Sequence, residues 1–73
     1  MRYWIQSLPS GAVVAIRAVA DPSADDDVIP QVWSVQAQRW IDDESILDDM
    51  IWDPWVREAS VGEIVSIAGQ RAA

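Results

Sequence analysis

Six carboxylates lie within twelve residues in the second half of the chain, and they are the side chains best suited to chemistry. They are Asp42, Asp43, Glu44, Asp48, Asp49 and Asp53. Asp49 and Asp53 are four residues apart and would be neighbours on a helix, where two carboxylates can bind Mg²⁺ or share a proton. For acid/base chemistry of the glycosidase kind the pair must also flank a substrate cleft, which we do not expect a chain of 73 residues to form. We therefore expect these carboxylates to cap helices and to solvate a helix face.

The side chains that the chain lacks exclude most other catalytic chemistry. The sequence contains no His, Cys, Lys, Asn, Thr or Phe. A Ser/His/Asp triad, a Cys/His pair, a Schiff-base lysine and a zinc site built from Cys or His are all impossible within one chain. We predict a protein that is not an enzyme and that has no cofactor and no metal site.

Five tryptophans compete for the interior of this small chain, namely Trp4, Trp33, Trp40, Trp52 and Trp55. Each indole buries roughly 150–250 Å² and needs a partner for its N–H, so we do not expect all five to be buried. Trp33 and Trp40 are predicted core residues, and of Trp52 and Trp55 we expect Trp55 to be the more exposed. Exposed tryptophans are enriched where proteins bind one another. An aromatic cage for a cationic ligand is a further possibility.

Charge narrows the choice of partner. Twelve acidic residues oppose five arginines, giving a net charge of −7, which disfavours nucleic acid and anionic membrane surfaces. Asp48 and Asp49 have no Lys or Arg within their predicted helix, which favours a basic partner from outside. The predicted partner-binding residues are Trp52, Trp55, Arg57, Asp48 and Asp49. No small-molecule substrate is indicated.

The first part of the chain predicts strands. The segment RYWIQS and the segment GAVVAIRAVAD are rich in β-formers and flank a loop that contains Pro9 and Gly11, so they predict an antiparallel hairpin. The second strand is apolar on both faces, as is typical of a central strand. Residues 21–30 are predicted to form an acidic loop. In residues 32–41 both a strand and a helix period fit, and β-branched and aromatic residues favour a third strand.

The second part predicts helices. Asp42 or Asp43 can cap a helix whose apolar stripe is Ile46, Leu47, Met50 and Ile51. Pro54 ends this helix, and Asp53 can cap a short helical turn that runs to Glu58. Ser60 and Glu63 match a capping box before a helix that ends at Gly69, although residues 61–69 also fit a strand.

The expected fold is one α+β domain over residues 1–73. It consists of a small three-stranded antiparallel sheet followed by two short helices packed on one face, in the order β-β-β-α-α, with a frayed C-terminus at residues 70–73.

Trp40, Asp43 and Leu47 lie in a segment of the form W-x-x-D-x-x-x-L, and Ser60 and Glu63 begin an S-x-x-E helix. With the opening hairpin, this pattern resembles a diffuse group of short uncharacterised proteins from high-GC, actinobacterial-type bacteria. The resemblance covers about two-thirds of the chain and implies the order of the elements but no activity.

These observations predict a small, non-enzymatic, acidic interaction protein of the cytoplasm, because no signal-peptide pattern precedes the first strand. It would self-associate or bind a basic or amphipathic protein surface through exposed tryptophans. The alternative is an inhibitor or immunity-type protein that blocks a nucleic-acid-binding or nuclease site by acidic mimicry.

Overall fold

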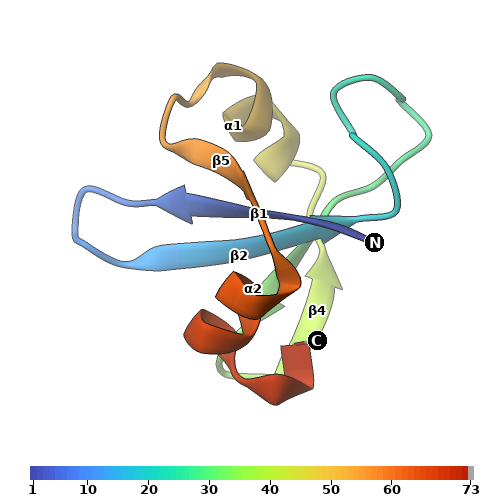
Figure 1. Cartoon of the computed structure of the whole chain (residues 1–73). Coiled ribbons are helices and arrows are strands. Elements are labelled where there is room, and N and C mark those ends of the chain that lie inside the picture. The colour runs from blue at the N-terminus through green and yellow to red at the C-terminus, as the bar shows by residue number, and fades with distance from the viewer. Residues whose placement is uncertain (73) are drawn as a thin grey trace.

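The protein is an α+β domain built on one antiparallel sheet, as a computed structural model that describes residues 1–72 shows (Figure 1). The strands are β1 (Arg2–Ser7), β2 (Val13–Ala18), β3 (Gln31–Ser34), β4 (Arg39–Asp42) and β5 (Val56–Ala59). The helices are α1 (Ile46–Trp52), α2 (Val61–Ala68) and a short 3-10 helix, η1 (Gln70–Ala72). The strand order is β4-β3-β2-β1-β5, so the predicted α+β class is confirmed, whereas the predicted three-stranded sheet is wrong because there are five strands.

The first hairpin forms as predicted, with Trp4 opposite Ile16 and Ile5 opposite Ala15. The Leu8 N–H donates to the Ala12 carbonyl, and Gly11 closes the loop at a φ of 89°, which favours glycine. β2 is the middle strand of the sheet, and both of its faces are covered.

Residues 31–42 form two strands rather than the single third strand predicted for residues 32–41. A four-residue turn joins β3 and β4, where the Gln38 N–H donates to the Ser34 carbonyl at 2.8 Å and Gln38 has a positive φ of 54°. The turn contains no Gly, Pro or Asn, the residues that usually identify a hairpin in a sequence. The turn places Trp33 directly opposite Trp40, with ring centroids 5.5 Å apart in an edge-to-face arrangement.

The segment after Pro54 also differs from the prediction. In place of a helical turn that runs to Glu58, residues Val56–Ala59 form β5, which pairs with β1 and places Ala59 opposite Tyr3. Four residues carry too little pattern to predict a strand. The free edge of β1 supplies the hydrogen bonds that decide the conformation.

The two helices cover opposite faces of the sheet, so the predicted packing of both on one face is wrong. Ile64 of α2 is fully buried in a cluster with Ile5, Ala15 and Trp33. Ile46 of α1 packs in a second cluster, made with Trp4, Ile16, Ala18 and the half-buried Val28 of the loop between β2 and β3. Figure 1 shows α1 on one side of the β1–β2 ribbon and α2 on the other. Alternation of side chains along β1 and β2 supplies both faces.

The C-terminal prediction holds at its start and fails at its end. The Ser60 hydroxyl accepts from the Glu63 N–H at 3.2 Å, and Gly69 ends α2 with a φ of 89°, so the serine half of the predicted capping box and the terminal glycine are present. The Glu63 carboxylate instead pairs with Arg57. Of the residues predicted to fray, 70–73, the described ones form η1 (Gln70–Ala72), in which Ala72 is buried and its carbonyl accepts from the Trp40 Nε1–H at 3.1 Å. Ala73 lies outside the described residues.

The predicted acidic loop, residues 21–30, contains no helix or strand. Pro22 and Pro30 are buried near its two ends, and the side chains of Asp25, Asp26 and Asp27 are exposed. Because Val28 packs in the same cluster as Ile46, the loop and α1 cover the same face of the sheet.

Candidate protein-interaction surface

The helix α1 begins at a different residue from the one predicted. Ser45 is the N-cap and its side chain makes no capping bond, whereas the Asp43 carboxylate accepts from the Ser45 N–H at 3.0 Å. Asp42 belongs to β4, where its carboxylate accepts from the Gln31 side chain. The capping role predicted for Asp42 is therefore wrong, and Asp43 instead forms a turn just before the helix.

Asp53 and Pro54 end α1 and turn the chain into β5. The Asp53 N–H donates to the Asp49 carbonyl at 2.8 Å, and the Asp53 carboxylate accepts from the Trp55 N–H at 2.8 Å. Asp53 thus has the predicted double role, as it closes one element and starts the next. The element that follows is a strand.

A buried glutamine at the end of β1 holds this turn in place. Gln6 is 4% exposed, and its Nε2 donates to both the Asp49 and the Asp53 carboxylates, at 3.0 Å each. The hydrogen bond from Gln6, followed by the one from the Trp55 backbone, lowers the pKa of the Asp53 carboxyl below its usual value. Asp49, predicted to bind a partner, therefore also ties α1 to the sheet. The Gln6 contact was not predicted, because the residues lie 43 and 47 positions apart.

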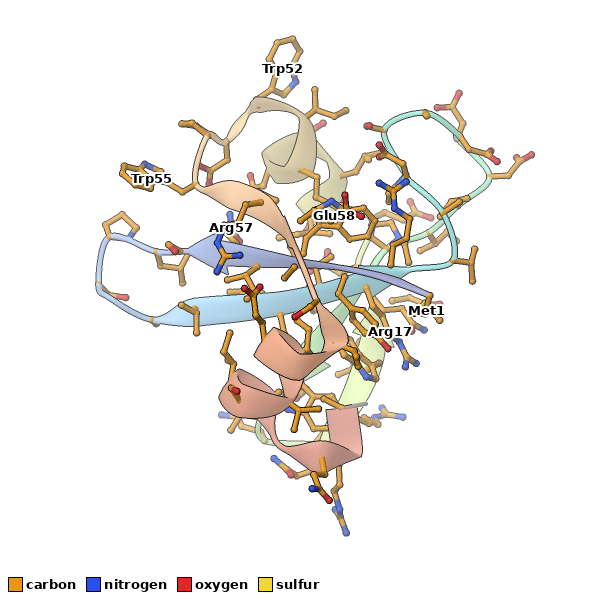
Figure 2. The ribbon with its side chains drawn as sticks, in the orientation of Figure 1. Met1, Arg17, Trp52, Trp55, Arg57 and Glu58 are labelled. Atoms are coloured by element: carbon orange, nitrogen blue, oxygen red, sulfur yellow. The ribbon has the colours of Figure 1, made fainter. Side chains whose placement is uncertain are left out.

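Both predicted interface tryptophans are exposed, Trp52 by 80% and Trp55 by 69%. The prediction that Trp55 is the more exposed of the two is wrong. Trp52 lies two residues after Met50, which packs on the core, and two residues turn a helix by about 200°. Its side chain therefore points away from the buried stripe, as Figure 2 shows.

Trp55 lines an apolar hollow with the β1–β2 loop. The hollow has a volume of about 330 Å³ and is lined by Ser7, Leu8, Pro9 and Trp55, which together are called the Trp55 hollow below. The Ser7 N–H donates to the Trp55 carbonyl at 3.1 Å, so the backbone holds the two walls together. Figure 2 shows Trp55 pointing to the side of the β1–β2 loop, whereas Trp52 projects in another direction. Leu8 and Pro9 were not predicted to bind a partner, because Pro9 and Gly11 indicated only a loop between two strands.

Arg57 is paired within the described part of the chain. It lies opposite Ile5 in the register of β5 and β1, and its guanidinium pairs with the Glu63 carboxylate of α2 at 3.0 Å. The neighbouring Glu58 lies on the other face of β5 and pairs with Arg2 at 2.9 Å. Arg57, predicted to bind a partner, is therefore exposed and forms an ion pair with α2.

The carboxylates of α1 are not neutralised within the chain. Ten of the twelve acidic residues lie between positions 21 and 53. Across residues 1–72 the ion pairs are Arg2–Glu58 and Arg57–Glu63, neither of which involves these ten. Asp48 is exposed and follows the predicted pattern of an unopposed acidic residue on the helix. The side of the sheet covered by α1 and the acidic loop is therefore strongly negative.

The carboxylate metal site and the aromatic cage, which were minor alternatives, are not favoured by the geometry. Within residues 1–72 no group of three or more acidic side chains is arranged to hold a metal ion. The guanidinium carbon of Arg17 lies 4.6 Å from the ring centroid of Trp40, so an internal cation already covers one aromatic face that a cage would need.

No helix in the described part of the chain is long and apolar enough to cross a membrane. Comparisons of the chain with protein-family models, with curated proteins and with solved structures gave no match.

Proposed function

We propose that the protein is a non-enzymatic interaction module that binds a protein surface through Trp55 and the α1 carboxylates near it, and that the second exposed tryptophan, Trp52, lies outside this contact. The partner is a second copy of the chain or another protein with a basic or amphipathic surface. The observation that carries the proposal is the exposure of two large indoles in a chain that buries its three others wholly or in part. Exposed aromatic groups of this size are common at binding hot spots.

We expect the stability of the fold to depend little on these two rings. Both project from the surface, so replacing either with alanine is expected to change the free energy of unfolding by less than about 0.5 kcal/mol. A side chain that contributes little to folding yet exposes a large apolar area is well suited to binding.

Photo-cross-linking tests this proposal directly. Benzoylphenylalanine replaces Trp55 in one variant and Ile67 in a matched control, because Ile67 is also exposed, by 40%, but lies on α2. In cells that make the protein, we expect a discrete adduct from position 55 and none from position 67. Mass spectrometry of the adduct identifies a second copy or a different protein. Equal adduct patterns at the two positions, or none at position 55, would contradict the proposal.

A second candidate function is acidic mimicry, in which the protein blocks a nucleic-acid-binding or nuclease site. It is favoured by the ten carboxylates between residues 21 and 53, none of which forms an ion pair within residues 1–72. Binding of this kind weakens steeply as salt rises, because the charges that attract one another are exposed. A cross-linker at position 48 would then capture the partner more efficiently than one at position 55.

A further inference from the structure

We infer that the occupant of the Trp55 hollow is a basic, amphipathic segment of another protein. One bulky apolar side chain of that segment lies in the hollow, and its Lys or Arg side chains face the carboxylates of Asp48, Asp49 and Asp53. This inference rests on the proposed function and names the chemistry of the partner.

The hollow suits a single side chain. Its volume of about 330 Å³ is at the lower end of the roughly 300–1,000 Å³ found for ligand pockets. Leu8, Pro9 and the indole of Trp55 make its lining mainly apolar. The N–H of Gly11 donates to the Leu8 carbonyl and the N–H of Ser7 donates to the Trp55 carbonyl, at 2.9 and 3.1 Å. Because these bonds hold both walls before a partner arrives, little ordering is needed on binding.

The charge beside the hollow is negative. The Asp53 carboxylate bonds to the backbone N–H of Trp55, and Asp49 shares the same Gln6 amide group with Asp53. Asp48 precedes Asp49 on α1 and is exposed. The nearest arginine in the sequence, Arg57, is paired with Glu63 of α2 rather than with these carboxylates. A partner that places Lys or Arg side chains over these three carboxylates is therefore attracted to them electrostatically.

The same charge disfavours the other occupants. In a two-fold dimer the same patch lies on both sides of the interface, so the α1 carboxylates of one copy would approach those of the other, in chains of net charge −7. Nucleic acid and anionic membranes carry the same sign and are repelled. A basic protein segment is the occupant for which both the apolar contact and the electrostatic attraction favour binding.

Three synthetic helical peptides of equal length test the inference. The first alternates Leu and Lys to form an amphipathic basic helix, the second replaces every Lys with Glu, and the third replaces every Leu with Ser. The readout is the fluorine spectrum of protein labelled with 5-fluorotryptophan, in which single Trp→Phe variants assign the five resonances. We expect the Leu/Lys peptide to shift the Trp55 resonance and to leave that of the buried Trp33 unchanged. The Leu/Glu peptide should not bind, and the Ser/Lys peptide should bind weakly and be lost at high salt.

Two variants of the protein locate the contact. Trp55→Ala is expected to weaken binding of the Leu/Lys peptide by about 30-fold or more, as at a binding hot spot. Trp52→Ala is the matched control, because Trp52 is at least as exposed but lies outside the hollow, and a loss of less than about threefold is expected, as for contacts outside a hot spot. Far-ultraviolet circular dichroism and urea unfolding confirm that both variants fold.

Several results would overturn the inference. Equal binding of the Leu/Glu and Leu/Lys peptides would show that charge does not select the partner. An equal loss from the two tryptophan variants would remove the hollow as the site. A dimer in size-exclusion chromatography with light scattering that requires Trp55 would make the occupant a second copy, and a Trp55 shift with neutral lipid vesicles would make it a membrane. If no peptide binds although position 55 cross-links to a protein in cells, the proposed function stands and this partner chemistry fails.

Discussion

Replacing Ile64 with alanine tests the packing of α2 most directly. Ile64 is fully buried in the cluster with Ile5, Ala15 and Trp33. The substitution removes three side-chain carbons, each worth about 0.8 kcal/mol of transfer free energy. The cavity that remains adds to this loss, so we expect the free energy of unfolding to fall by about 3–4 kcal/mol. For a chain of 73 residues the total is only about 4–11 kcal/mol, so the variant should lose a third or more of its stability.

Ile67→Ala is the matched control, since it changes the same residue type on the same helix at a side chain that is 40% exposed. Its expected cost is about 1 kcal/mol or less, because less apolar area leaves the interior and alanine favours the helix. Urea unfolding followed by tryptophan fluorescence measures both values. If Ile64→Ala does not fold, Ile64→Val should still cost about 0.5–1.5 kcal/mol. An equal or greater loss from Ile67→Ala would refute the assigned orientation of α2.

Other predictions concern the layers of the fold, its glycines and its acidic turn. Ile46→Ala should be additive with Ile64→Ala within about 0.5 kcal/mol, since they lie in separate clusters on opposite faces, and a larger coupling would argue for one shared core. Gly69→Ala should cost about 1–3 kcal/mol because its φ of 89° and ψ of 170° are strained for other residues. Gly62→Ala, with ordinary space around the new methyl group, should stabilise by about 0.4–1 kcal/mol, and calorimetry separates the two glycine variants. The pKa of the Asp53 carboxyl is lowered in the folded state, so its contribution to stability is present above its ordinary value of 3.8 and is lost as the pH falls through the lower folded value. Urea unfolding across this acidic range should therefore show a shallower loss for Asp53→Asn than for the unaltered chain, and parallel curves would contradict the role of Asp53.

Local patterns in the sequence determined much of the fold. Apolar residues on both faces of the second strand predicted its central position, which the strand order confirms. Ser60, Glu63 and Gly69 predicted the limits of α2 because capping depends on bonds within a few residues. The absence of His, Cys and Lys excluded whole classes of catalysis. Such features act over short distances or through composition, so a single sequence is enough to read them.

Tertiary structure alone decided the remaining elements. The strand β5 exists because β1 has an unpaired edge more than fifty residues away in the sequence, and β3 and β4 are separate strands because a turn without glycine adopts a positive φ at Gln38. The resulting five-stranded sheet has a core cluster on each face, and α1 and α2 cover opposite faces.

The candidate site was predictable only in part for the same reason. The exposure of Trp55 was predicted, but its hollow depends on Leu8 and Pro9. These residues are brought beside it by strand pairing and by the contact of Gln6 with Asp49 and Asp53. The sequence by itself therefore determined which side chains are available to bind a partner. Which of them form one surface was decided by the sheet, because hydrogen bonds between distant segments set their positions.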